Sequence, residues 1–210
     1  QSFLIDWYFI KKTFIHTEEY YPIPIAHGNK LIQIAGSGPD SDWKSLLHAF
    51  CKIISSAKKY VYLQTPYFLP PESLLHNMKI AALSGVDVRL LISENSDAKV
   101  TNTASRSYLR ELMEAGVNIY FYKKGFIHSK TIVADDSVST IGSTNLDFRS
   151  FELHFEINAF VYDKDFAIQM KEIYKNDLKN SSLISLNEWK KREKWTKFKE
   201  SLARLFSPLL

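Results

Sequence analysis

Short apolar segments alternate with helix-like segments from residue 31 to residue 122, and this alternation restricts the chain to few folds. The segment Val86–Ile92 is almost continuously hydrophobic, as is typical of a strand buried on both faces. Strands that alternate with helices usually lie parallel within one sheet, with helices packed against its faces. We therefore predict an α/β fold, with a mixed β-sheet sandwiched between helices.

The expected elements follow from periodicity and from the positions of proline and glycine. After Gly125 no helix is expected between the last three strands, and a helix follows the last of them. Residues 153–162 alternate strictly, which places His154, Glu156 and Asn158 on one polar face. Strands are expected at 31–35, 60–65, 86–92, 117–122, 127–134, 138–141 and 153–162. Helices are expected at 1–20, from Asp40 or Ser41 to 57, at 72–83, from Thr103 or Ser105 to 115, and at 164–179.

The composition is that of an ordinary folded protein, with 45% hydrophobic residues and a net charge of +4. A single cysteine, Cys51, excludes an internal disulfide and a multi-cysteine zinc site. No apolar run approaches the ~18 residues of a membrane-spanning helix, and no basic segment precedes the first apolar residues, so we expect no signal peptide. Because residue 1 is not methionine, we expect a fragment or a processed product.

The positive charge lies in the last segment of the chain. From Leu186 onward there are seven basic and three acidic residues, which accounts for the whole net charge of +4 and leaves the remaining body neutral. Trp195, Phe198, Leu202 and Leu205 recur at helical spacing between these charges. Such a basic amphipathic helix suits an anionic membrane surface, but it suits equally a helix that packs its apolar stripe on the domain or on a missing half of the protein. We divide the chain into an appendage (1–24), a main domain (25–185) and this helix (186–210).

One short stretch combines residues that suit phosphoryl chemistry. His128 and Lys130 are two residues apart on an expected strand, so both side chains would face the same site. Ser143 and Asn145 follow the next strand and offer a hydroxyl and an amide, which can donate to phosphate oxygens without adding charge. A nucleophile, a cation and neutral donors suit a reaction through a covalent histidine adduct.

The spacing of these residues resembles the signature of the phospholipase D superfamily. His128-x-Lys130 is followed by four residues and Asp135, and then by six residues and Gly-Ser-x-Asn, which ends at Asn145. The resemblance is greatest to the cardiolipin synthase branch, and it covers essentially the whole chain. The further segments that carry it are residues 1–7, 64–68, 104–108, 145–151 and 204–210.

The resemblance implies a transphosphatidylation that makes cardiolipin from two molecules of phosphatidylglycerol, through a phosphatidyl-histidine intermediate and without a metal or other cofactor. Family members carry two such signatures in one active site, whereas this sequence has one copy. The chain would then be the second catalytic half, completed by an N-terminal half or by a second copy of itself at a bacterial cell membrane. Whether His128 is the nucleophile or the general acid and base stays open.

Two acidic residues have competing interpretations. Glu156 matches an acidic position of the family, and we expect its carboxylate to hold the second ring nitrogen of His128; the alternative is a solvent-facing strand residue. Asp135 belongs to the catalytic signature by resemblance. Its odd offset from His128 places it on the opposite strand face, at a turn, and this favours a structural role.

Three further residues are candidates for a lipid-headgroup cleft, namely Tyr67, Arg106 and Arg149. Cys51 lies among apolar helix residues and is expected to be a small core residue.

Three other functions compete with cardiolipin synthesis. Another phospholipid transferase or hydrolase of the superfamily, such as a phosphatidylserine synthase or a lipase, would use the same motif with a different acceptor. A nuclease with one motif per chain would dimerise to complete its site, but the neutral body argues against binding nucleic acid. A non-enzymatic interaction domain would have no reason to keep the complete set of motif residues.

Overall fold

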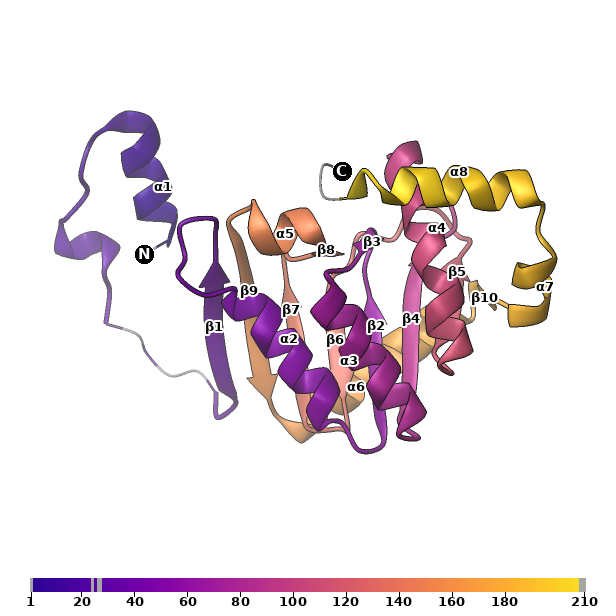
Figure 1. Ribbon diagram of the computed structural model, residues 1–210. Coiled ribbons are helices and arrows are strands. Elements are labelled where there is room, and N and C mark those ends of the chain that lie inside the picture. The colour runs from indigo at the N-terminus through magenta and orange to yellow at the C-terminus, as the bar shows by residue number, and fades with distance from the viewer. Residues whose placement is uncertain (1, 24, 26–27, 208–210) are drawn as a thin grey trace.

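The computed structural model describes residues 2–23, 25 and 28–207, which form a layered α/β fold as predicted (Figure 1). One eight-stranded mixed sheet and one two-stranded sheet are present in this part of the chain. The large sheet comprises β1 (Leu31–Ser37), β2 (Tyr60–Gln64), β4 (Asp87–Ser93), β5 (Asn118–Tyr122), β6 (Thr131–Ala134), β7 (Val138–Gly142), β9 (Glu156–Tyr162) and β10 (Ser181–Leu183). The small sheet comprises β3 (Phe68–Leu69) and β8 (Leu146–Asp147).

Helices lie on both faces of the large sheet, whereas α1 stands apart from it at the left of the view (Figure 1). Their bounds are α1 (Ser2–Lys11), α2 (Ser45–Ser56), α3 (Glu72–Leu83), α4 (Lys99–Glu114), α5 (Phe148–Glu152), α6 (Lys164–Leu178), α7 (Leu186–Lys191) and α8 (Lys194–Arg204), with a 3₁₀ turn at Glu18–Tyr20. Helices α2, α3 and α4 cover one face, and α6 covers the other. Within the described ranges, no helix combines the length and the hydrophobicity that crossing a bilayer requires.

The strand order is β1-β9-β7-β6-β2-β4-β5-β10. Strands β2, β4 and β5 are parallel, as the alternation predicts, whereas β6, β7 and β9 continue the sheet with antiparallel pairs. The expectation of a parallel neighbour is wrong for β1, which pairs antiparallel with β9 at the edge of the sheet. The register pairs Gln64 with Thr131, Thr131 with Ile141, and Gly142 with Asn158. The end of β2, the start of β6, the end of β7 and the start of β9 therefore meet at one border of the sheet. We call this border the upper edge, marked by Gln64, Thr131, Gly142 and Glu156.

Two apolar layers explain why β4 is hydrophobic on both faces. Leu90 packs into the larger core with the helices α2, α3 and α4, and Leu91 packs into the smaller core with Tyr174 of α6. Both leucines are fully buried. The continuous apolar run predicted from the sequence is thus confirmed as a central strand.

Several predicted bounds are wrong. The first helix ends at Lys11 instead of Tyr20, because Lys12 adopts a left-handed backbone with φ of 54°. The strand expected from residue 127 begins at Thr131, and the strand expected from 153 begins at Glu156, after the unpredicted α5. Gln1, Pro24 and residues 208–210, which the resemblance and the expected domain bounds include, lie outside the described residues.

Candidate active site

His128 lies at the upper edge, in the loop between β5 and β6. The loop turns at Gly125, whose φ of 97° favours glycine, and it is then fixed by the buried Ile127. The backbone N–H of Ile127 donates to Ser93 Oγ at 2.9 Å, and Ser93 is the last residue of β4. The chain is therefore anchored one residue before His128, whose own side chain is exposed.

Lys130 lies beside His128, as the spacing predicts. Its Nζ is 3.3 Å from His128 Nδ1 and donates to the carbonyl oxygen of His128 at 2.8 Å. Strand alternation does not cause this pairing, because β6 begins only at Thr131; the lysine side chain folds back onto the loop. Burial lowers the pKa of Lys130 from its ordinary value, and the nearby carboxylates of Glu156 and Asp147 oppose that effect.

The turn that follows β7 is built around Gly142. A Cβ atom on this residue would overlap the side chain of Asn158 and the carbonyl oxygen of Ile157. The space it leaves lets the buried Asn158 cross to β7, where Nδ2 donates to Thr140 Oγ1 at 3.0 Å and Oδ1 accepts from Thr144 Oγ1 at 2.6 Å. Asn158 thus fixes the turn that carries Ser143. The sequence analysis did not single out Asn158 as a support for the site, although it predicted its strand face.

Ser143 faces Glu156 across the β7–β9 pair. Its hydroxyl accepts from the Ile157 N–H at 3.0 Å and donates to Glu156 Oε2. The second oxygen of Glu156 lies 3.8 Å from Nδ1 of His154. Only 9% of the Glu156 side chain is exposed, so its charge is largely shielded from water.

The expected contact between Glu156 and the ring of His128 is absent from the hydrogen bonds of the described residues. The prediction assumed that the strand of Glu156 neighbours the strand of the motif. In the observed strand order β7 lies between β9 and β6, so the start of β9 adjoins Ser143 instead. Glu156 still acts on the site through its charge, which opposes the effect of burial on Lys130.

Asn145 and Asp147 enclose the far side of this turn. Asp147 is buried and caps α5, where its Oδ1 accepts from the Ser150 N–H at 2.7 Å. Burial raises the pKa of Asp147 above the ordinary aspartate value, and hydrogen bonds from Ser150 and Asn145 oppose that effect. Asn145 Oδ1 is buried and has no hydrogen-bond partner among the described residues. Asp147 was not predicted as a site residue, although aspartate is among the residues preferred at a helix N-cap.

A hollow of about 230 Å³ lies beside these residues. Tyr67 and Arg149, two of the three headgroup candidates, line it together with Asn145, Asp147 and His154. The hydroxyl of Tyr67 donates to Asp97 at 2.7 Å, and burial followed by this contact raises the pKa of Tyr67 to about 12. The ring of Phe126 lies 5.9 Å from that of Tyr67 and 5.6 Å from that of His128, and so links the hollow to the motif.

Arg106 does not belong to this hollow. Helix α4 turns it toward α7 and α8, where Nη2 donates to the carbonyl oxygen of Glu94 at 2.8 Å and the guanidinium lies 4.8 Å from the Phe121 ring. Arg106 is half-buried, and this burial lowers the pKa of its guanidinium. The structure thus does not bring Arg106 together with Tyr67 and Arg149, and its role in a headgroup cleft stays a prediction.

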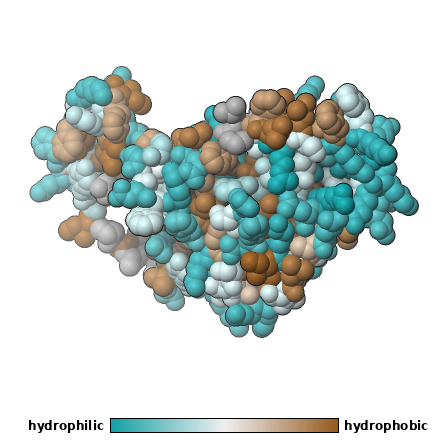
Figure 2. Space-filling model, viewed as in Figure 1, coloured by the Kyte–Doolittle hydropathy of each residue, from teal (hydrophilic) through white to brown (hydrophobic). Residues whose placement is uncertain are grey.

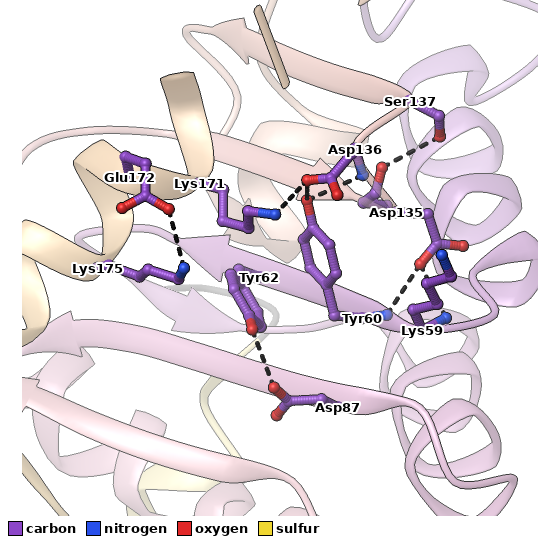
Figure 3. Close-up of polar contacts among 11 residues, drawn as sticks. Lys59, Tyr60, Tyr62, Asp87, Asp135, Asp136, Ser137, Lys171, Glu172 and Lys175 are labelled. Atoms are coloured by element: carbon purple, nitrogen blue, oxygen red, sulfur yellow. Dashed lines mark hydrogen bonds and ion pairs between the residues drawn. The ribbon is translucent and has the colours of Figure 1, made fainter. Parts of the chain in front are cut away.

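Asp135 lies at the other end of β6, in the turn to β7 (Figure 3). Its carboxylate accepts backbone N–H groups from Lys58 at 2.6 Å, from Lys59 at 2.9 Å and from Tyr60 at 2.9 Å. Burial alone would raise the pKa of Asp135, but these hydrogen bonds outweigh it and hold the pKa below its ordinary value. The geometry supports the structural interpretation over a catalytic one.

The arrangement places an imidazole and an ammonium together at an exposed edge, with a hydroxyl and an amide on the neighbouring turn. This set can hold an anionic phosphodiester and offer it a nitrogen nucleophile or a proton. Among the residues that the structure describes, no three His, Cys, Asp or Glu side chains gather as a metal site requires.

Comparison with known proteins gives the family. The profile described as "Cardiolipin synthase, PLD-like domain" matches residues 50–178, which is more than half of the chain. The chain belongs to this PLD-like domain family. The match includes His128, Lys130, Asp135, Ser143 and Asn145.

Two curated relatives match this chain over nearly its whole length. A cardiolipin synthase of Listeria monocytogenes and cardiolipin synthase 2 of Staphylococcus epidermidis are each 42% identical to it over 99% of the chain. The chain spans only 44% of the first relative and 43% of the second.

Solved structures share the PLD-like fold at low sequence identity. Nuc, a phospholipase D family member from Salmonella typhimurium, is 19% identical with a TM-score of 0.63, over 74% of this chain and 99% of its own. The phosphatidylserine synthase of Haemophilus influenzae is 16% identical with a TM-score of 0.66, over 85% of this chain and 45% of its own. At these identities the likeness concerns the fold.

Proposed function

We propose that this chain is one catalytic half of a cardiolipin synthase. The observation that carries the proposal is the pair of His128 and Lys130, in contact at an exposed edge of a PLD-like domain. The 42% identity to proteins named cardiolipin synthase supports phosphatidylglycerol as the substrate.

The reaction has two displacements at phosphorus. In the first, a ring nitrogen of one histidine attacks the phosphorus of phosphatidylglycerol, the bond from phosphorus to the glycerol oxygen breaks, and the opposite histidine donates the proton that glycerol takes away. In the second, the hydroxyl of another phosphatidylglycerol attacks the phosphatidyl-histidine. Its proton returns to the opposite histidine, and the phosphorus–nitrogen bond breaks to release cardiolipin. His128 takes one of these two roles.

The remaining motif residues would hold the phosphate during both displacements. The ammonium of Lys130 neutralises the phosphodiester beside His128, which is a role that a metal ion fills in other phosphoryl-transfer sites. Ser143 and Asn145 contribute neutral donors, provided that the Ser143 hydroxyl turns from Glu156 to the bound phosphate. The hollow beside Asn145 accepts the polyol headgroup, whose hydroxyls can bond with the polar side chains that line it, Tyr67 and Arg149 among them.

The second histidine must come from a partner, and an apolar face of the sheet is suited to receive it. Ile34, Ala159 and Ile141 are direct neighbours across β1, β9 and β7, and Ile157 lies two residues along β9. Exposed fractions of 61% for Ile34 and 43% for Ile157 leave this face uncovered next to Ser143. Because the chain matches less than half of its relatives, we assign this face to the other catalytic half.

The test identifies the products formed from phosphatidylglycerol labelled in its glycerol headgroup. The chain is assayed at high concentration and in a mixture with the segment of the Listeria monocytogenes relative that lies outside the match. We expect equal release of glycerol and cardiolipin, loss of both in His128→Ala, and no loss in the control His76→Ala, whose histidine is exposed on α3.

Three results would argue against the proposal. Phosphatidic acid without cardiolipin would indicate a hydrolase, and cleavage of DNA would indicate a nuclease. Activity that a chelator abolishes and a divalent ion restores would show that Lys130 is not the group that neutralises the phosphate.

A further inference from the structure

Helix α8 turns its apolar side away from the protein. Trp195, Phe198, Leu202 and Leu205 form one stripe along the helix and its last turn, which we call the outer stripe. Their exposed fractions are 62%, 55%, 47% and 74%. A helix at a protein surface normally buries such a stripe against the core.

The buried side of α8 is polar. Glu200 is buried and forms a two-pronged ion pair with Arg192, at 2.6 Å and 2.9 Å, and the guanidinium of Arg192 stacks over the buried Trp189. Arg204 donates to Glu111 of α4 at 3.0 Å and lies over the Tyr108 ring. These contacts fix the rotation of the helix, because turning the outer stripe inward would break both ion pairs. Packing of the stripe on this domain is thus contradicted, which leaves a membrane surface or the missing half as its partner.

The charges around the outer stripe fit an anionic partner. Helical spacing places Lys194 and Lys199 on its two borders, and both are exposed. Neither forms an ion pair in the part of the chain that the structure describes, whereas Lys190 and Arg192 are paired with Glu114 and Glu200. Apolar side chains bordered by lysines, with a tryptophan among them, are typical of helices that lie in the interface of an anionic bilayer.

The outer stripe lies at the same end of the molecule as the active site. Figure 1 shows α8 across the top of the view, at the level of α5, β3 and β8, which adjoin the upper edge of the sheet. In Figure 2, hydrophobic atoms gather along the outer surface of this helix. A flat surface resting on α8 would therefore be near the end of the protein that carries His128.

We propose that α8 is a fixed membrane-docking helix, which inserts the outer stripe into an anionic lipid surface and turns the upper edge toward that surface. The binding of α8 to a membrane is inferred from the geometry of this helix alone. The further step, in which docking brings substrate lipid to His128, rests on the proposed function. The helix is rigidly attached through Glu200 and Arg204, so it also sets the height of the site above the bilayer.

The test measures binding of the full chain to vesicles of phosphatidylglycerol and of phosphatidylcholine. We expect tighter binding to phosphatidylglycerol, and part of that binding should disappear in high salt, which screens the lysines. Lys194→Gln combined with Lys199→Gln should weaken binding by roughly ten-fold or more, and Leu202→Ser should weaken it by roughly ten-fold. The matched controls are Lys52→Gln on α2 and Leu83→Ser on α3, both exposed and far from α8 in the chain.

Two readouts decide the outcome. Quenching of tryptophan fluorescence by brominated lipid should fall in Trp195→Phe if this ring enters the bilayer. His128→Ala should bind vesicles like the unchanged chain, so that loss of activity and loss of docking are separate results.

Equal binding by the α8 variants and the control variants would overturn the proposal. So would self-association of the chain that Leu202→Ser abolishes without an effect on vesicle binding.

Discussion

At the scale of single residues, Gly142 shows how packing limits what the motif can contain. We expect Gly142→Ala to destabilise the fold by about 1–3 kcal/mol, because the added methyl group would displace Asn158 or the backbone of Ile157. Urea unfolding measures this change. The control is Gly28→Ala, where a Cβ would meet no atom within 4 Å. Equal stability of the two variants would show that Asn158 relaxes without cost.

Glu156 gives a prediction about pH. Its negative charge opposes the effect of burial on Lys130, so Glu156→Gln should lower the pKa of Lys130 further. If catalysis needs the protonated ammonium, the alkaline limb of the rate profile should then move to lower pH. The profile of Glu152→Gln, whose carboxylate pairs with Lys44 at 3.2 Å, serves as the control. If the alkaline limb does not move in Glu156→Gln, the protonation of Lys130 does not control the rate of the reaction.

The residues of the motif could be assigned from the sequence because their spacing is local. The pairing of His128 with Lys130 depends on two residues of separation, and the structure keeps it even though the expected strand is shorter. The partner of Glu156 could not be assigned, because it depends on which strand lies beside β9. The separation of Arg106 from Tyr67 and Arg149 could not be foreseen either, since the side of α4 that faces α7 and α8 is decided by tertiary packing.

At the scale of elements, Asp135 ties the β6–β7 turn to the start of β2. We expect Asp135→Asn to lower the melting temperature, because an amide cannot accept the three backbone N–H groups as a carboxylate does. Turnover per folded molecule should be largely kept, since Asp135 lies at the opposite end of β6 from the site. Thermal unfolding and activity measured on the same sample distinguish the two effects.

The stabilising effect of Asp135 should depend on pH. Because its pKa is lower in the folded protein than in the unfolded chain, its contribution is complete above the unfolded value of about 4 and is lost as the pH falls through the folded value. The difference between the unchanged chain and Asp135→Asn should therefore shrink in acid. Asp42→Asn, an exposed position, is the control. Unchanged stability with reduced turnover in Asp135→Asn would return this residue to the catalytic set.

Apolar runs predicted the central elements better than the peripheral ones. Strands β2 and β4 are largely buried and β5 is buried at every second residue, so hydrophobicity marks them, and the helices between them indicate their parallel order. The short α5 and β10 were not predicted. A five-residue helix depends on the cap that Asp147 provides, and β10 depends on pairing with β5. The tail was predicted as one helix, but it bends between Lys191 and Lys194, where Arg192 leaves helical geometry to reach Glu200.

At the scale of the whole molecule, two exposed surfaces lie at the end that carries the candidate active site. The apolar face of β1, β9 and β7 leaves Ile34 and Ile157 open beside Ser143, and the outer stripe of α8 lies at the same end (Figure 1). We propose that the apolar sheet face binds the other catalytic half and that the outer stripe of α8 binds the lipid surface. A chain with one histidine–lysine pair is therefore expected to be inactive by itself.

In our proposal His128 works only with a second histidine, so turnover should depend on protein concentration. Turnover of phosphatidylglycerol per chain is determined as protein concentration is raised, with the oligomeric state measured by sedimentation under the same conditions. We predict little or no turnover while the chain is monomeric, and activity that appears only with a dimer or with an added complementary half. Full turnover by a strict monomer would contradict the account.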